Sequence, residues 1–229
     1  MGWRTSSLVI ALRNVGRVIG INRLLIGAFP RGYEANYNVR LSKCISPGDT
    51  VWDIGANIGL YTAQFANLVG ASGLVVAFEP SKVNFLRLAH TCQSLRNVEL
   101  QPFGLGNADG NIRFQQGADE LGATSRVCET GEPGEVVEIR VGDDLIAKGL
   151  PAPNVIKLDV EGFEGEVLTG LSGRLLSPEL VAVGVEVHFG ILHDRGLGSM
   201  PRQIEQMLRD VGFRIDWPDT SHILATRPV

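Results

Sequence analysis

The stretch VWDIGANIGLYTAQFANLV, residues 51–69, decides the fold. It opens with a short apolar run that contains Asp53 and is typical of a buried strand. Gly55 and Gly59 then allow a sharp turn, and residues 60–69 carry the spacing of a helix. Strand, glycine-rich turn and helix in this order predict the first unit of an α/β fold.

The segments that follow repeat this alternation. Residues 74–78 form a second apolar strand that ends at Glu79, and Ser81 is a predicted N-cap for a helix over 82–94. A third strand is expected at 98–100. This spacing predicts a parallel, doubly wound sheet, in which the strand ends share one edge and ligands bind along it.

Further strands and helices are predicted in the rest of the chain, although its middle part is less regular. Strands are expected at 112–115, 136–141, 155–158, 180–189, 213–217 and 223–226, the last two as an antiparallel pair. Helices are expected at 143–149, from the residues after Asp159 to about 171, and at 201–211. His193 and Asp194 fall in a predicted glycine-rich loop that follows the strand at 180–189.

Composition and charge exclude several classes of protein. The chain has 229 residues, of which 44% are hydrophobic, and a net charge of −4. A broad nucleic-acid surface needs clustered positive charge, so no nucleic-acid partner is expected. Cys44, Cys92 and Cys128 are far apart and form no CxxC motif, which favours reduced thiols and a cytoplasmic protein.

Residues 1–40 are predicted to be an N-terminal helical extension, with the main domain in 41–229. Leu8, Leu12 and Val15 share one face of this helix, and arginines interrupt its apolar run. No stretch has the length that spans a bilayer, so no transmembrane segment is expected. We expect the helix to pack on the main domain. The alternatives are a lid, a homodimer contact and a membrane-surface helix.

Acidic residues end the first two strands, where a cofactor would lie. A dinucleotide loop reads GxGxxG and holds a pyrophosphate, which a carboxylate at Asp53 would repel. Glu79 is placed to accept hydrogen bonds from ribose hydroxyls. S-adenosylmethionine carries an ammonium, a sulfonium and a ribose but no phosphate, so the two acids favour this cofactor. A nucleotide-binding oxidoreductase is the alternative that they disfavour.

Four segments together resemble the FkbM family of S-adenosylmethionine-dependent methyltransferases: VWDIGANIGLYT (51–62), VVAFEPSKVNFLRL (75–88), VIKLDVEGFEGEVLTGL (155–171) and VGVEVH (183–188). The resemblance runs from about Gly48 to Phe213. It implies a class I, Rossmann-like α/β domain with a mostly parallel seven-stranded doubly wound sheet and an antiparallel terminal strand. It also implies methylation of a hydroxyl on a sugar, glycolipid or natural product, either a small molecule or a glycan- or lipid-linked acceptor.

The resemblance also assigns the binding residues. DxGANxG is the family's methionine-binding loop, FEP holds the ribose, and the stretch 103–107 corresponds to a loop beside the adenine. The predicted cofactor-binding residues are Asp53, Gly55, Ala56, Asn57, Gly59, Tyr61, Glu79, Asn84, Gly104, Leu105 and Asp159.

The segment IKLDVEGFE predicts the catalytic residues. Asp159, Glu161 and Glu164 crowd three carboxylates around a helix start, where opposed pressures on pKa values are typical of functional sites. An attacking hydroxyl must lose its proton, and Asp159 is the predicted base. His188 is the rival base because its ordinary pKa lies near neutral pH. Lys157 completes the predicted catalytic set.

The sequence contains a possible divalent metal site, but we do not expect a metal to bind there. Glu186 and His188, two apart on a predicted strand, could bind a divalent ion together with Asp159, but a lone ExH pattern is frequent by chance. His90 and His222 are expected to be surface or packing residues. For the function, the alternatives are methylation of nitrogen or carbon and a non-catalytic adenosyl-binding module.

Overall fold

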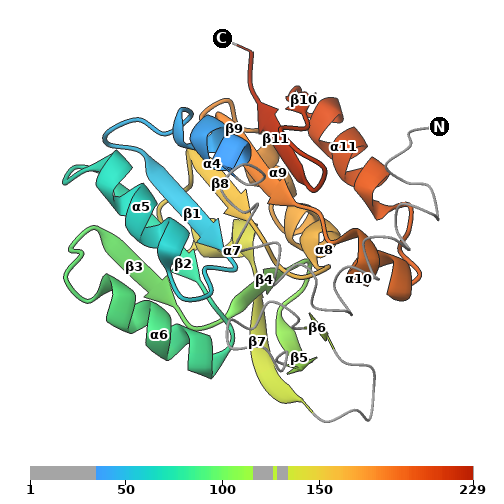
Figure 1. The fold of residues 1–229 in the computed structure, drawn as a ribbon, viewed down its shortest axis with the longest axis horizontal. Helices are drawn as coiled ribbons and strands as arrows, with labels where there is room; N and C mark the ends of the chain where they lie inside the picture. The colour runs from blue at the N-terminus through green and yellow to red at the C-terminus, as the bar shows by residue number, and fades with distance from the viewer. Residues whose placement is uncertain (1–34, 116–125, 128–133, 229) are drawn as a thin grey trace.

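The structure is a computed structural model that describes residues 35–115, 126–127 and 134–228 (Figure 1). Seven strands form the main sheet in the order β10-β11-β9-β8-β1-β2-β3. All neighbouring pairs are parallel except the two that include β11. The strands are β1 (Thr50–Ile54), β2 (Leu74–Phe78), β3 (Val98–Gln101), β8 (Val155–Leu158), β9 (Ala182–Glu186), β10 (Arg214–Asp216) and β11 (His222–Thr226). The predicted α/β sheet with an antiparallel terminal strand is confirmed.

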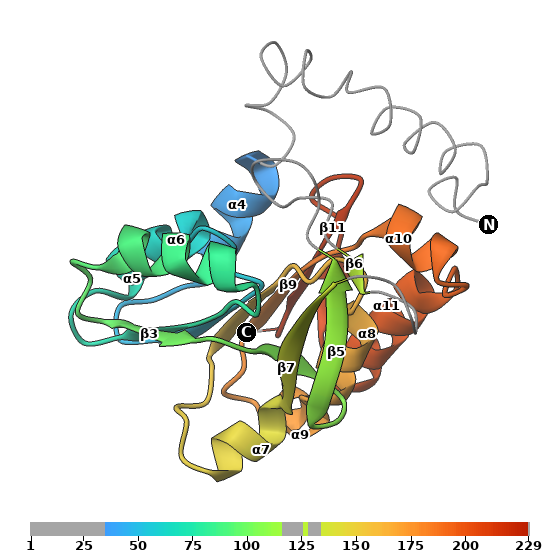
Figure 2. The same cartoon turned by 90° about the horizontal axis from the view of Figure 1, so that it is seen from below.

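Helices cover both faces of this sheet (Figures 1 and 2). On one face lie α4 (Ala35–Ser42), α5 (Leu60–Val69) and α6 (Lys82–Cys92), and on the other lie α7 (Gly142–Ala147), α8 (Glu164–Thr169), α9 (Ser172–Leu176) and α11 (Met200–Asp210). Alternate residues of β1 point to opposite faces, as in any strand, so Val51 packs under α5 while Trp52 packs under α8. The predicted cap of α6 is confirmed, because Ser81 Oγ accepts the Asn84 N–H at 3.4 Å.

A second, smaller sheet was not predicted. Its order is β4-β7-β5-β6, with the strands β4 (Gly104–Gly106), β7 (Glu135–Val141), β5 (Gly110–Gln115) and β6 (Arg126–Val127). Gly170, at the end of α8, allows the second sheet to pack against this helix. A Cβ added at Gly170 would lie 1.9 Å from the carbonyl oxygen of Gly106, so the two backbones meet at a distance that no other residue at position 170 allows.

Two local predictions are wrong. Strand β9 ends at Glu186 instead of continuing to residue 189, because its partner β11 begins at His222, directly opposite Glu186. His188 therefore lies beyond the strand. The predicted glycine-rich loop is instead the helix α10 (Phe189–Asp194), which includes His193 and Asp194.

The structure describes only the last part of the predicted N-terminal extension, residues 1–40. Residues 1–34 lie outside the described residues, as does Cys128. Helix α4 crosses the predicted domain boundary at 40/41, and its Tyr37 and Leu41 are buried in one cluster with Val51 and Val155 of the sheet. Cys44 and Cys92 are free thiols. None of the described helices is long and apolar enough to cross a membrane.

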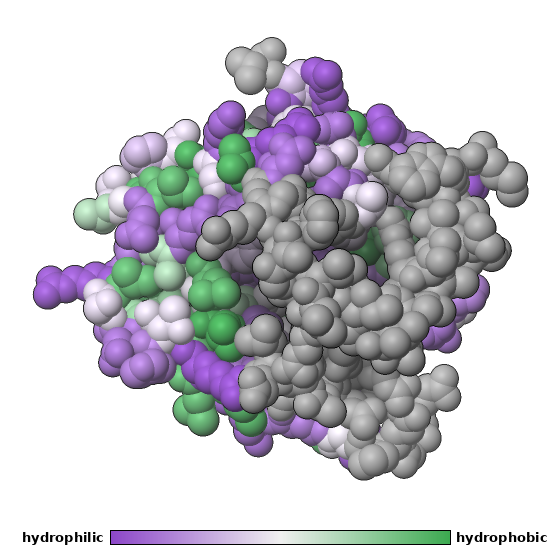
Figure 3. Space-filling view, in the orientation of Figure 1, coloured by the Kyte–Doolittle hydropathy of each residue, from purple (hydrophilic) through white to green (hydrophobic). Residues whose placement is uncertain are grey.

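The molecular face over α5 and α6 carries hydrophobic side chains among hydrophilic ones (Figure 3). Leu60 of α5 and Leu86 of α6 are 70% and 71% exposed. These two side chains point away from the sheet, so the core that positions the strand ends does not depend on them.

Candidate active site

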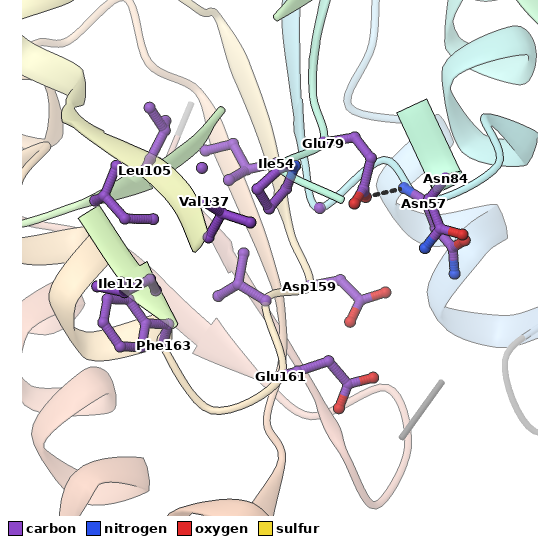
Figure 4. A pocket seen from close by; sticks show the side chains of 15 residues that line it. Ile54, Asn57, Glu79, Asn84, Leu105, Ile112, Val137, Asp159, Glu161 and Phe163 are labelled. Atoms are coloured by element: carbon purple, nitrogen blue, oxygen red, sulfur yellow. Dashed lines mark hydrogen bonds between the residues drawn. The ribbon is translucent and has the colours of Figure 1, made fainter. Parts of the chain in front are cut away.

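A cleft opens at the carboxyl ends of β1, β2 and β8 (Figure 4). It encloses about 720 Å³ of empty space, part of it open to solvent. Carboxylates line the cleft at Glu79, Asp159 and Glu161, and no described lysine or arginine does. The cleft therefore has a negative lining that suits a cationic ligand.

The cleft has a polar end and an apolar end (Figure 4). Glu79 lies with Asn57 and Asn84 at the polar end, and the carboxylates of Asp159 and Glu161 point the same way. The apolar end comes mainly from the second sheet, and apart from Leu105 its residues were missed by sequence reasoning, because no local pattern shows that these strands meet the cleft. Its residues are Leu105, Ile112, Val137, Ile139 and Phe163.

Glu79 is held in place by the backbone around it. Its Oε2 accepts the Asn57 N–H at 2.8 Å and its Oε1 accepts the Ser81 N–H at 2.9 Å. Burial raises the pKa of Glu79 to about 7, although these two N–H groups act in the opposite direction. The carboxylate is thus oriented toward the cleft, and its charge changes near neutral pH.

Asp53 lies beneath the cleft and does not line it. Its side chain is fully buried, with Oδ1 at 3.1 Å from Lys157 Nζ and Oδ2 accepting the Thr62 hydroxyl at 2.6 Å. Lys157 Nζ also donates to the Gly55 carbonyl oxygen at 2.8 Å. Burial alone would lower the pKa of Lys157, but Asp53 and Asp159 raise it above its ordinary value. This buried pair fixes the turn that follows β1.

The residues of that turn divide between the cleft and the interior. Gly55 and Asn57 line the cleft, as do Asn84, Gly104 and Leu105 from the predicted binding set. A Cβ on Gly55 would lie 1.8 Å from the Asp159 carbonyl oxygen, so glycine allows β1 and β8 to end in contact. Ala56, Gly59 and Tyr61 are not among the lining residues, and Tyr61 lies with its ring 5.4 Å from Lys157 Nζ.

His188 is buried among carboxylates next to the cleft. Its Nδ1 lies 2.6 Å from Glu164 Oε1, and its Nε2 lies 3.5 Å from Asp159 Oδ1 and 3.3 Å from Glu161 Oε2. Burial alone would lower the pKa of His188, but the Glu164 hydrogen bond and the carboxylates raise it to about 10. The near-neutral pKa that made His188 a rival base is therefore not found.

Asp159 occupies the centre of the cleft floor. Its Oδ2 lies 3.5 Å from Lys157 Nζ, while its Oδ1 faces His188. Burial raises the pKa of Asp159, and Lys157 and His188 counteract this effect. A partly exposed carboxylate with a raised pKa, flanked by two cations, is able to accept a proton from a ligand in the cleft.

The metal-capable set differs from the one weighed from the sequence. One ligand atom each from Asp159, Glu161 and His188 lies within 4.8 Å of the others. Glu186 is farther away, with Oε1 at 4.0 Å from His188 Nε2. The difference arises because His188 lies beyond the end of β9 and not on it.

His222 is a buried neighbour of the site that sequence reasoning missed. Its Nδ1 lies 2.9 Å from Asp219, its Nε2 lies 3.6 Å from Glu186 Oε2, and its ring stacks on Tyr37. Burial alone would lower the pKa of His222, but these carboxylates raise it to about 9. Only the register of β11 against β9, which places His222 opposite Glu186, could have revealed this contact.

Two curated proteins are similar in sequence to this chain. Hexuronic acid methyltransferase AglP of Haloferax volcanii is 34% identical over 62% of this chain, and the match covers 57% of that protein. The 31-O-demethyl-FK506 methyltransferase FkbM of Streptomyces tacrolimicus is 27% identical over 75% of each chain. The chain thus spans little more than half the length of the first relative.

Solved structures and the family model give a consistent result. SMU.1697c of Streptococcus mutans, a putative methyltransferase solved in complex with SAH, superposes with a TM-score of 0.50 at 12% identity, over 84% of this chain and 96% of that one. The likeness shows the class I methyltransferase fold. The model of the methyltransferase FkbM domain matches residues 53–215. With most of its length inside that match, this chain belongs to the FkbM methyltransferase family.

Proposed function

We propose that the protein transfers a methyl group from S-adenosylmethionine to an oxygen atom of its acceptor. The observation that carries the proposal is the lining of the cleft, which has three carboxylates and no lysine or arginine among the described residues. Such a lining attracts the ammonium and sulfonium of this donor and repels a pyrophosphate. Its apolar end suits a planar adenine ring.

The proposed contacts follow the two ends of the cleft. Glu79 accepts the ribose hydroxyls, and the wall formed by the second sheet contacts the adenine. Gly55, Asn57 and Asp159 hold the methionine part. Asp53 acts indirectly, because its ion pair with Lys157 holds the Gly55 carbonyl oxygen in place.

The reaction that we propose is an in-line displacement. The acceptor oxygen forms a bond to the methyl carbon while the carbon–sulfur bond breaks. The electron pair of the carbon–sulfur bond stays on sulfur. The acceptor proton passes to Asp159. Alignment of oxygen, methyl and sulfur supplies much of the rate, and a positioned base supplies a further part.

The acceptor group that we propose is a hydroxyl on a sugar, glycolipid or natural product. The names of the two relatives support this class, since one acts on a hexuronic acid and the other on a demethylated FK506. The test is transfer of an isotopically labelled methyl group to a panel of uronic acids, neutral sugars and macrolides, read by mass spectrometry. A cytoplasmic location and a homodimer remain predictions from the sequence.

Donor binding tests the role of Glu79 directly. We expect S-adenosylmethionine and S-adenosylhomocysteine to bind saturably in calorimetry, and Glu79→Gln to weaken both about 10- to 100-fold, because charge-assisted hydrogen bonds contribute roughly 1.5–3 kcal/mol each. Glu99→Gln, an exposed acid on β3, is the matched control and should bind as the wild type does. Absence of heat with either ligand would refute the proposed donor.

The pH dependence of donor affinity should follow the ionisation of the Glu79 carboxylate. Because the pKa of Glu79 is about 7, the ionised form that accepts ribose hydroxyls is lost as pH falls through 7. We expect affinity to drop about tenfold between pH 8 and pH 6. The pKa of Asp159 in the same cleft is also raised, so its titration could contribute to the profile. The pH profile of Glu79→Gln is therefore measured as well, because it contains every contribution except that of Glu79. A profile that is equally steep in this variant would assign the titration to another group.

A further inference from the structure

Three potential metal ligands converge at one side of the cleft. Asp159 and Glu161 follow β8 and line the cleft, and His188 follows β9 and is buried behind them. Figure 4 shows the two carboxylates pointing the same way. The three side chains come from neighbouring strand ends of a rigid sheet, which holds their donor atoms in fixed relative positions.

The distances between the donor atoms fit a shared ion. Ligands bound to one ion at roughly 2.0–2.2 Å in tetrahedral or octahedral geometry lie about 3.0–3.5 Å apart. His188 Nε2 lies 3.5 Å from Asp159 Oδ1 and 3.3 Å from Glu161 Oε2. The ligand atoms of all three side chains lie within 4.8 Å of one another, so one cation can contact all three after a modest approach of the two carboxylates.

His188 is oriented as a metal-binding histidine is. Its Nδ1 lies 2.6 Å from Oε1 of Glu164, which is fully buried and also accepts the Gly162 N–H at 3.0 Å. A metal-binding histidine almost always donates its second ring N–H to a carboxylate or carbonyl, which fixes the ring and the tautomer. Here that bond directs Nε2 toward Asp159 and Glu161.

The negative charge around His188 also favours binding of a cation. Around His188 and Lys157, acidic side chains outnumber basic ones: the acids are Asp53, Asp159, Glu161, Glu164 and Glu186. Lys157 already pairs with Asp53, and His222 already pairs with Glu186. Buried carboxylates are stable when they are paired or coordinate a metal, so the excess negative charge next to His188 favours a divalent ion.

We propose that Asp159, Glu161 and His188 bind a divalent first-row metal ion beside the cleft. Two carboxylates and one imidazole suit Mn²⁺ or Zn²⁺ better than an ion restricted to oxygen ligands. The remaining coordination positions face the cleft and take oxygen atoms of the acceptor, which brings a hydroxyl or carboxylate into an otherwise acidic site. This proposal departs from the expectation from the sequence that no metal is bound.

Direct metal binding by the untagged 229-residue chain, after EDTA treatment and dialysis, tests the site. Mn²⁺ is titrated and its free fraction is followed by electron paramagnetic resonance, with Zn²⁺ and Mg²⁺ tested by calorimetry. We expect saturable binding at one site per chain. No donor or acceptor is present, so the result is independent of whether the proposed methyl transfer is correct.

Glu161→Gln is the decisive variant, because it removes one ligand charge and preserves the shape of the side chain. We expect its Mn²⁺ affinity to fall at least about tenfold, as happens even when groups around a metal ligand are lost. Glu179→Gln, an exposed acid paired with Arg174, should bind Mn²⁺ as the wild type does. Circular dichroism confirms folding, and Asp159→Asn provides a second ligand variant.

Two results would overturn the site. One is the lack of saturable binding of Mn²⁺, Zn²⁺ and Mg²⁺ to the wild type. The other is unchanged Mn²⁺ affinity in both folded ligand variants, which would place any bound ion elsewhere on the protein.

Discussion

Asp159→Asn is expected to lower turnover about 10²- to 10⁴-fold and to weaken donor binding much less, because Gly55 and Asn57 also hold the methionine part. The amide keeps the size of the side chain at the end of β8 but does not accept a proton at neutral pH. Burial raises the pKa of Asp159, which makes the carboxylate a stronger base than an exposed aspartate. An acceptor hydroxyl in the cleft would then have no positioned group to take its proton.

Single-turnover assays with labelled donor and the acceptor found in the panel measure this loss, and calorimetry measures donor affinity. Asp194→Asn, an exposed aspartate on α10, is the matched control and should keep full turnover. Equal turnover in Asp159→Asn would reject it as the base. Such a result would favour a nitrogen acceptor, which attacks through its own lone pair.

A bound metal ion would add to this effect, and Glu161→Gln separates the two contributions. That variant loses a proposed ligand of the ion but keeps the Asp159 carboxylate. If turnover of Glu161→Gln is restored by a high Mn²⁺ concentration while Asp159→Asn stays inactive, Asp159 has a role beyond coordination. If both variants recover, coordination explains both losses.

The main sheet could be predicted because its pattern is local. Each apolar strand is followed within a few residues by its turn and helix, and β2 has the bounds expected from the sequence, Leu74–Phe78. The second sheet could not be predicted, because β4 is only Gly104–Gly106 and pairs with β7 more than thirty residues later. Periodicity identifies strands, but it does not identify the partner of a short one.

The candidate site was likewise predictable only where local motifs specify it. Glu79 and Asp159 line the cleft as expected, since both follow strands at the binding edge. Asp53 also ends near that edge, but its carboxylate turns into the interior, where Lys157 of the adjacent strand β8 meets it. Whether an acid at a strand end faces the ligand or a buried cation depends on such a partner, which a local motif does not specify.

Lys157→Met is expected to lower the free energy of unfolding by about 3–5 kcal/mol, because removal of one member of a buried ion pair leaves the other charge uncompensated. Lys157 is 4% exposed and Asp53 is fully buried, so water does not replace the lost ammonium. Asp53 would keep the hydrogen bond from Thr62, while the Gly55 carbonyl oxygen would lose its Lys157 donor. Urea denaturation measures the change.

A double-mutant cycle identifies the charge as the cause. Asp53→Asn combined with Lys157→Met removes both charges, so we expect the double variant to be clearly more stable than the sum of the two single losses predicts. Arg209→Met breaks the exposed pair with Glu205 and should cost no more than about 1 kcal/mol. Additive losses in the cycle would show that the Lys157 side chain stabilises the fold through packing, and the turn after β1 would then not depend on its ion pair with Asp53.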